Sequence, residues 1–364
     1  MTSTLSSRCI RRTEVGGVNS AFRRLGFAAA FLSLLVLSAC RAPIPGLPAP
    51  PTTASFAVST PSPSPILREA DTATPTATSI PLPRADRVVI ISIDGLRPDG
   101  LLRADIPNIS RLINGGAATF SAKTILPSGT LPAHASMVSG RCVSKHGILW
   151  NDLVPSEEPL QGPTVFSIAH DAGLRTVMVV GKEKLITLAR PGTVDSFRYE
   201  PDSVDERTVN VALEEAAKGF GVLFVHFILP DYFGHLDGWM TPAYLQGIGR
   251  DDAVVGTLVD GLRNLGLLRG TLVILTADHG GHDLTHGTYR NEDMLIPWIV
   301  YGAGVSEGAA IGVPVSVMDT AATAVWILGL SVPADWDGRP VVEAFGLQAA
   351  PLSIPTASPF HCGI

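Results

Sequence analysis

The chain has 364 residues, of which 46% are hydrophobic and 16% are charged, and its formal net charge at pH 7 is -6. This composition excludes a chain that is disordered throughout, and it allows a large buried core with an upper limit of roughly two domains. The charged residues are interspersed and form no basic stripe. We therefore expect no nucleic-acid binding, which needs clustered positive charge against the phosphates.

Residues 1–39 have the pattern of a lipoprotein-type signal peptide. A pair of arginines precedes the apolar run of residues 25–36, which is too short for a permanent membrane span. The run ends in Leu-Ser-Ala-Cys, and small residues before a cysteine resemble the lipobox of bacterial lipoproteins, in which the cysteine is acylated. We expect an exported protein that is lipid-anchored through Cys40 on the outer side of the bacterial cytoplasmic membrane, at the cell surface or in the periplasm. The alternative is an ordinary signal peptide that is cleaved nearby.

Residues 40–86 begin with this cysteine and are dominated by Pro, Thr, Ser and Ala without helical or strand periodicity. We expect a disordered stalk, which at about 3.1 Å per residue extends on the order of 100 Å. Residues 347–364 are also rich in proline, and we expect a loose tail. Removal of the leader and acylation of Cys40 leave Cys142 and Cys362, which either pair in an oxidising compartment or remain separate thiols.

Between these flanks, short apolar runs alternate with segments in which apolar residues recur every three or four positions. The runs predict buried strands, and the periodic segments predict amphipathic helices. The expected strands are residues 87–93, 176–181, 222–229, 271–277 and 297–302, and the expected helices are residues 106–116, 204–219, 244–266 and 317–330. This alternation predicts one α/β domain over residues 87–346, with a mainly parallel sheet sandwiched between helices.

Acidic residues and histidines follow three of these strands. Asp94 comes directly after the first strand, Asp231 and His235 after the third, and Asp278 and His279 after the fourth. Open α/β sheets assemble their sites at the carboxyl ends of strands. Carboxylate with imidazole, and without thiolate, is a ligand set that suits zinc or a similar divalent ion. The sequence therefore predicts a metal site at this edge of the sheet.

Two further histidines compete for a place in this site. Gly280, Gly281 and Gly287 allow the chain to fold back toward the strand end, and His282 and His286 both lie in this stretch. We favour His286 as the ligand because a glycine follows it. His282 is then a residue beside the site or on the surface.

Thr130 is the candidate nucleophile. Pro132 suits the first turn of a helix, and a helix N-terminus offers unpaired N–H groups and a favourable dipole to an anion. A threonine hydroxyl attacks poorly unless a metal ion deprotonates it. Taken alone, Thr130 is more consistent with a simple helix N-cap than with a nucleophile, so its assignment depends on the other motifs.

Those motifs occur in one order along the chain. They are D-G-L-R-P-D from Asp94, T-L-P-A-H-A-S-M-V-S-G from Thr130, H-G-I-L-W-N ending at Asn151, P-D-Y-F-G-H ending at His235, and A-D-H-G-G with a later H-G at His286. Together they resemble the alkaline phosphatase superfamily, and most closely its type I phosphodiesterase/nucleotide pyrophosphatase family. The resemblance covers nearly all of residues 87–346 and implies an alkaline phosphatase-like fold.

The resemblance also implies a two-metal site and a metal-dependent phosphoric ester hydrolase. One Zn²⁺ would be held by Asp231, His235 and His286, and the second by Asp94, Asp278, His279 and the Thr130 oxygen. Asn151 matches the family's phosphate-binding asparagine. A phosphodiesterase/nucleotide pyrophosphatase of this kind acts on small phosphorylated substrates through a phosphothreonine intermediate, with metal ions about 4 Å apart.

Some positions depart from the family. Leu131 and His226 stand where an aromatic pair usually holds a nucleotide base, and Gly129 stands where a lysine is common in vertebrate members. Two alternative functions remain. One is a phosphomonoesterase of the same superfamily, in which Arg141 or Lys145 would approach the phosphate. The other is a non-catalytic surface lipoprotein that binds without chemistry. The sequence makes no prediction of the oligomeric state.

Overall fold

A computed structural model describes residues 84–154, 160–201 and 205–349. The contacts divide the chain into residues 1–76 and 77–364, and every described residue belongs to the second unit. The expected signal peptide, Cys40 and nearly all of the stalk lie outside the described residues. The last two residues assigned to the stalk form hydrogen bonds with the domain. The amide of Ala85 donates to the carbonyl oxygen of Ile327, and the amide of Asp86 donates to that of Gly270.

Eight strands form one mixed sheet in the order β4-β3-β5-β1-β6-β7-β2-β8. Neighbouring strands from β4 to β6 are parallel, β7 is antiparallel to both β6 and β2, and β8 is parallel to β2. The strands are β1 (Arg87–Ile93), β2 (Gly116–Lys123), β3 (Thr176–Val180), β4 (Ser196–Tyr199), β5 (Val222–Phe227), β6 (Thr271–Thr276), β7 (Leu295–Gly302) and β8 (Ala309–Ala310). The predicted mainly parallel sheet is therefore confirmed.

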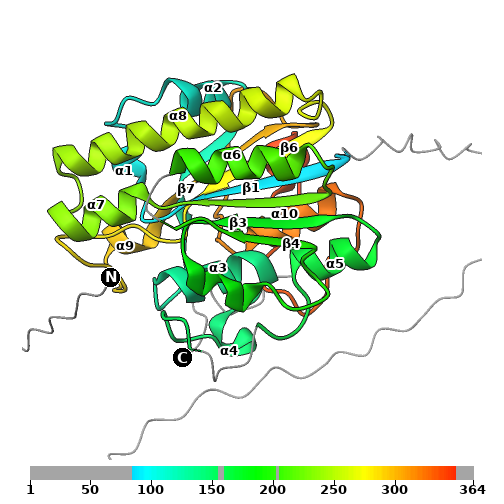
Figure 1. Cartoon of the computed structure of the whole chain (residues 1–364), viewed down its shortest axis with the longest axis horizontal. Coiled ribbons are helices and arrows are strands. Elements are labelled where there is room, and N and C mark those ends of the chain that lie inside the picture. The colour runs from blue at the N-terminus through cyan, green and yellow to red at the C-terminus, as the bar shows by residue number, and fades with distance from the viewer. Residues whose placement is uncertain (1–83, 155–159, 202–204, 350–364) are drawn as a thin grey trace, which may run out of the picture. The chain divides into compact units, whose positions relative to one another are not determined.

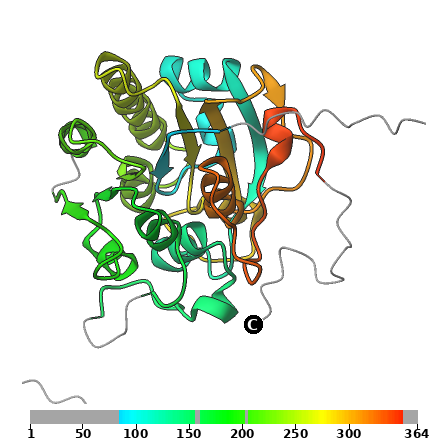
Figure 2. The ribbon, with the colours of Figure 1, turned by 90° about the vertical axis from the view of Figure 1, so that its right-hand side faces the viewer.

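Helices cover both faces of this sheet (Figure 1, Figure 2). The long helix α8 packs with α2, α6 and α7 on one face, while α3, α5 and α10 contact one another on the other. The helices are α1 (Pro98–Leu101), α2 (Pro107–Asn114), α3 (Thr130–Ser139), α4 (Val143–His146), α5 (Val165–Asp171), α6 (Asp205–Ala216), α7 (Leu229–Asp237), α8 (Pro242–Asn264), α9 (Asn291–Met294) and α10 (Asp319–Ile327), with 3-10 turns at Glu183–Leu188 and Val342–Phe345.

The strands found from the sequence are those buried on both sides. Every residue of β5 and β6 is buried, as are six of the seven residues of β1. A strand covered by helices on both faces has no solvent side, so it reads as a continuous apolar run. The strands that the sequence did not indicate are β2, with the small and polar residues GAATFSAK, and the short edge strands β4 and β8.

Within the part of the chain that the structure describes, no helix is both long enough and apolar enough to cross a membrane. Cys142 takes part in a disulfide bond. Cys362, the partner considered from the sequence, lies outside the described residues.

Candidate active site

Side chains from three neighbouring strands meet at the carboxyl edge of the sheet. Asp94 follows β1 directly, and the amide of Asp231 donates to its carbonyl at 3.1 Å. Gly95 makes this approach possible, because its φ is +69° and a Cβ there would lie 2.9 Å from the Cα of Asp231. Helix α7 begins right after β5, so Asp231 and His235 are one turn apart on the same helix face.

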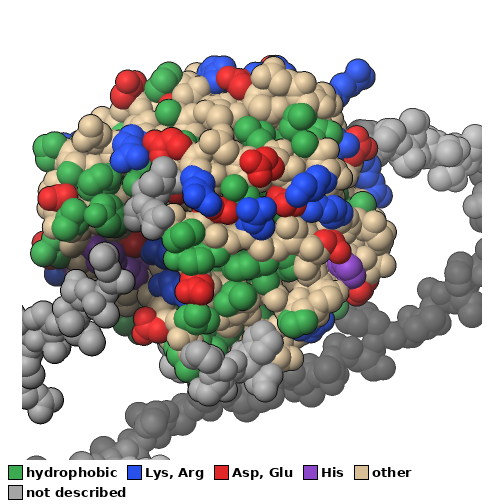
Figure 3. Space-filling model, viewed as in Figure 1, with side chains coloured by type: hydrophobic (Ala, Val, Ile, Leu, Met, Phe, Trp, Pro, Cys, Tyr) green, Lys and Arg blue, Asp and Glu red, His purple; other side chains and the backbone are tan. Residues whose placement is uncertain are grey.

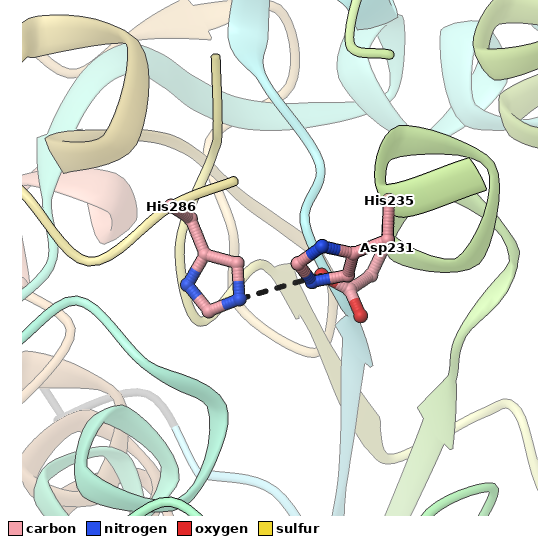
Figure 4. A group of neighbouring side chains, drawn as sticks. All are labelled: Asp231, His235 and His286. Carbon is pink, nitrogen blue, oxygen red and sulfur yellow. Dashed lines mark ion pairs between the residues drawn. The ribbon is translucent and has the colours of Figure 1, made fainter. Parts of the chain in front are cut away.

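The first candidate metal group consists of Asp231, His235 and His286, whose ligand atoms lie within 4.8 Å of one another. Figure 4 shows their side chains pointing toward a common space, His286 from a loop and the other two from α7. Oδ1 of Asp231 lies 3.4 Å from Nε2 of His235 and 3.8 Å from Nε2 of His286. The competing His282 instead makes a 2.6 Å contact with Asp293. The geometry therefore places His286 with the other two ligand candidates, and His282 outside the group.

The second candidate group consists of Asp94, Asp278 and His279, all fully buried. Nε2 of His279 lies 3.4 Å from Oδ1 of Asp94 and 3.3 Å from Oδ2 of Asp278. Gly280 allows this turn, because a Cβ there would lie 2.0 Å from the carbonyl oxygen of Glu292. Gly280, one of the three glycines considered from the sequence, thus lets the chain approach Glu292 closely.

All three histidines in the two groups present the same nitrogen to the site. Nδ1 of His235, His279 and His286 lies 2.7–3.0 Å from the backbone carbonyls of Leu284, Gly280 and Ser128, respectively. A carbonyl oxygen carries no proton, so Nδ1 must donate and Nε2 is left with its lone pair. This arrangement is the one that orients histidines as metal ligands. Burial, followed by the neighbouring His279, lowers the pKa of His286 to about 4, which keeps it neutral.

The atoms that face the two groups lack other partners. Among the described residues, Oδ1 of Asp94, Oδ1 of Asp231, Oδ2 of Asp278 and Nε2 of His279 are buried and have no hydrogen-bond partner. Buried carboxylate oxygens in this state cost free energy unless a cation or donor binds them. Burial, and then the charge of Asp94, raise the pKa of Asp278 well above its ordinary value. The unpaired atoms and the Nε2 atoms that face the two groups fit a pair of divalent cations.

Thr130 is the first residue of α3, and Gly129 is the N-cap. Thr130 is therefore the first helical residue and not the N-cap that was considered from the sequence. Oδ1 of Asn151 accepts a 2.8 Å hydrogen bond from the amide of Leu131. This bond turns the amide group of Asn151 toward the N-terminus of α3, where a phosphoryl oxygen would be stabilised.

The structure adds a lysine that the sequence reading missed. Nζ of Lys182 lies 2.7 Å from Oδ2 of Asp94, 2.6 Å from Oδ2 of Asp231 and 3.3 Å from Oγ1 of Thr130. It therefore binds the carboxylate oxygens that the two metal groups do not use. Although burial opposes its charge, Asp231 and Asp94 raise the pKa of Lys182 above its ordinary value, so it remains an ammonium. Lys182 follows β3 after a single glycine, and the strand-end rule that indicated Asp94 could have found it.

A second lysine in the same turn adjoins the phosphate-binding candidate. Nζ of Lys184 donates to the carbonyl oxygen of Asn151 at 2.9 Å and to its Oδ1 at 3.2 Å. The basic residues considered from the sequence are engaged elsewhere. Lys145 pairs with Asp337 at 2.6 Å, and Arg141 donates to the carbonyl of Gln161.

Two buried histidines contact Asp94 and Thr130. Nε2 of His226 lies 3.0 Å from Oδ2 of Asp94, and Nδ1 of His134 lies 2.7 Å from the carbonyl oxygen of Thr130. Nε2 of His134 lies 2.8 Å from Oγ of Ser92, so the hydroxyl donates to it. Leu131 and His226, expected at a base-stacking position, are both fully buried. They are core residues here and form no surface on which a base could lie.

Comparisons with known proteins identify similar sequences. The human GPI ethanolamine phosphate transferase 2 catalytic subunit is 27% identical over 289 residues, which are 73% of this chain and 29% of that protein. Rat ectonucleotide pyrophosphatase/phosphodiesterase family member 1 is 27% identical over 223 residues, which are 53% of this chain and 24% of that protein. The chain thus spans less than a third of the length of these two relatives.

The fold is that of the solved alkaline phosphatase-like structures. An inactive form of murine ectonucleotide pyrophosphatase/phosphodiesterase 5, in complex with AMP, superimposes with a TM-score of 0.60 at 14% sequence identity, covering 68% of this chain and 96% of that one. The expected fold class is therefore confirmed. The family model for type I phosphodiesterase / nucleotide pyrophosphatase matches residues 88–300, more than half of the chain. The protein belongs to this family within the alkaline phosphatase superfamily.

Proposed function

We propose that the protein is a metal-dependent phosphoric ester hydrolase, a phosphodiesterase or nucleotide pyrophosphatase in reaction type, that acts through a phosphothreonine intermediate at Thr130. The proposal rests mainly on the two Asp/His groups, which include buried ligand atoms without a hydrogen-bond partner among the described residues. Thr130, the first residue of α3, lies at the same edge of the sheet. The two groups would hold two divalent ions, most simply Zn²⁺, given their mixed nitrogen and oxygen ligands.

Different residues of the chain bind the phosphoryl group and activate Thr130. The backbone amide of Thr130, at the start of α3, and the side-chain NH2 of Asn151 hold the non-bridging oxygens of the phosphoryl group, while the amide of Leu131 donates to Oδ1 of Asn151. Lys182 stands 3.3 Å from Oγ1 of Thr130 and favours its deprotonated form. Metal ions bound by the two groups would supply further positive charge for the attacking and departing oxygens.

The reaction then has two balanced steps. Oγ1 of Thr130 loses its proton to solvent and bonds to phosphorus, while the bond from phosphorus to the ester oxygen breaks and the alkoxide takes a proton from water. A water molecule next loses a proton to solvent as its oxygen bonds to the phosphorus, the bond from phosphorus to Oγ1 breaks, and Oγ1 takes a proton from water to restore the hydroxyl. His134 contributes by fixing the backbone of Thr130 through its carbonyl.

A phosphomonoesterase is the second candidate. Two lysines, Lys182 and Lys184, lie at the nucleophile and at Asn151, where a monoester dianion has more charge to neutralise than a diester monoanion. Rates on bis(p-nitrophenyl) phosphate and p-nitrophenyl phosphate decide between the two, and a clear preference for the monoester would favour the second candidate.

Replacement of the nucleophile tests the covalent mechanism. We expect Thr130→Ala to reduce kcat by at least about 1,000-fold and to abolish a phosphoryl adduct detectable by mass spectrometry, while Thr130→Ser retains both in part. Thr257→Ala, at an exposed threonine of α8, is the matched control. Activity that survives in Thr130→Ala would rule out the phosphothreonine. Fewer than one bound zinc per chain would instead support the non-catalytic binding lipoprotein.

We also propose that the protein is exported and lipid-anchored through Cys40, on the strength of the leader pattern alone. Expression in a bacterium with Cys40→Ser tests this. The variant should move from the membrane fraction to the soluble extracytoplasmic fraction, and an unchanged distribution would contradict the anchor.

A further inference from the structure

Helix α7 carries an exposed apolar stripe next to the candidate active site. Tyr232 and Leu236 are 44% and 60% exposed, and Ile228, which is buried just before the helix, lines the same groove at the same four-residue spacing. We call these three residues the apolar shelf. In Figure 3, hydrophobic side chains over α7 lie beside histidine and Lys/Arg side chains.

The fold itself does not account for the shelf. The opposite side of α7 carries the contacts to the core, where Leu229 is buried and Phe233 packs against the hydrophobic cluster. The outward positions of a surface helix ordinarily carry polar residues. Adjacent exposed apolar side chains beside a polar site commonly mark a ligand-binding surface.

The shelf and the candidate active site line one continuous groove. The groove has a volume of about 430 Å³, and its other walls are Lys182, Asp231 and His235. This size lies within the range of roughly 300–1,000 Å³ for small-molecule sites. Its inner part is charged and its outer part is apolar, so it matches an amphiphilic molecule with an anionic head.

We propose that the shelf binds the apolar organic group of the substrate, so that the physiological substrate is a phosphoric ester of a hydrophobic alcohol. This inference rests on the proposed function, because the phosphoryl group must lie at Thr130 for the organic group to reach the shelf. Ile228, Tyr232 and Leu236 act as specificity-determining residues. Leu131 and His226 are fully buried, whereas Tyr232 and Leu236 are exposed and line the groove together with Asp231 and His235 of the first metal group.

Binding of a homologous inhibitor series tests the proposal. Methyl-, butyl- and octylphosphonate bind through the same phosphonate head, and only chain length varies. We expect the inhibition constant of the zinc-reconstituted full chain to fall about twofold per added methylene, less than the roughly fourfold of complete burial because the shelf is open on one side. Calorimetric titration measures the same trend without turnover.

The Tyr232→Ser/Leu236→Ser double variant should remove most of this dependence on chain length while leaving the constant for methylphosphonate unchanged. Leu102→Ser is the matched control, because Leu102 is 61% exposed and lies apart from the groove. An equal chain-length dependence in the wild type and the double variant would overturn the proposal. So would a lowered melting temperature of the double variant with an unchanged dependence, since another part of the protein would then cover the shelf. Failure of the proposed function looks different, because methylphosphonate would then bind to none of the proteins.

Discussion

Lys182 binds Asp94 through the carboxylate oxygen that the metal group does not use. Its Nζ lies 2.7 Å from Oδ2, while Oδ1 has no hydrogen-bond partner among the described residues. The same nitrogen binds Oδ2 of Asp231 and leaves Oδ1 unpaired in the same way. One ammonium therefore links a carboxylate from each metal group and orients both toward the positions that cations would occupy.

Loss of this ammonium should destabilise the metal-free protein most. Lys182→Met leaves Asp94 and Asp231 buried without their cation, and breaking such a pair costs about 3 kcal/mol. Zinc neutralises the same carboxylates, so the loss of stability should shrink when zinc is present. Thermal unfolding of the variant and the wild type, with chelator and with excess zinc, measures the difference.

Lys145→Met is the control for this comparison. Lys145 pairs with Asp337 at the surface, where its side chain is 43% exposed, so its loss should cost less than about 1 kcal/mol in either condition. An equal loss for Lys182→Met with and without zinc would show that Lys182 acts only as a structural ion pair.

His286 and His282 should differ sharply in their effect on metal binding. His286→Ala removes one of the three ligand candidates of the first group. It should lower the affinity for one of the two zinc ions by more than about 100-fold, which is the largest loss of affinity expected for a residue that only contacts a ligand. His282→Ala breaks the contact to Asp293, costs about 1–2 kcal/mol of stability and leaves both ions bound. Competition with a zinc chelator measures the affinities. Equal zinc loss in the two variants would contradict the placement.

The sequence predicts the centre of this fold better than its edges. The apolar runs that became β1, β5 and β6 are covered on both faces, so burial alone selects their residues. The residues of β2 are small, and this strand depends on pairing with β7 rather than on its own propensity. Helix α7 was also missed, because the sequence indicated only a strand followed by the two ligand candidates Asp231 and His235.

The sequence indicated the site residues that share one pattern, a carboxylate directly after a strand, and it missed a residue of another type at the same kind of position. Asp94, Asp231 and Asp278 each follow a strand as a carboxylate, and together they indicate a site. Lys182 also follows a strand, but a lysine in a turn ordinarily indicates solvent. By the resemblance, His226 stands at the position of an aromatic residue that holds a nucleotide base, whereas in the structure it is buried in β5 with Nε2 3.0 Å from Oδ2 of Asp94.

His146 should make the protein less stable in mild acid. Burial, and then the charge of Arg141, lower its pKa to about 4. The unfolded histidine has a pKa of about 6.5, so between pH 6.5 and 4 the unfolded chain binds more protons and stability falls as the pH falls. Nδ1 accepts from the amide of Ile148, and Nε2 contacts Ser136, so protonation also loosens the segment that leads to Asn151.

The size of this effect is at most about 3 kcal/mol across the interval. His146→Gln removes the imidazole contacts to Ile148 and Ser136, so it should be less stable than the wild type at pH 7. Because glutamine cannot take up this proton, the variant should also lose less stability between pH 6.5 and 4. Urea unfolding at pH values across this range measures both slopes. Identical slopes would show that other groups carry the pH dependence.

Restoring the family's aromatic residue after the proposed nucleophile, Thr130, should not create a nucleotide site. Leu131, the second residue of α3, is fully buried, so Leu131→Phe must overpack the core at a cost of about 1–3 kcal/mol. Leu131→Met conserves volume and should cost less than about 1.5 kcal/mol, which makes it the control. Because neither side chain reaches the groove, the affinity for AMP should stay the same in both variants, as measured by competition against an ester substrate. A more than tenfold tighter binding of AMP to Leu131→Phe would show that position 131 faces the substrate after all.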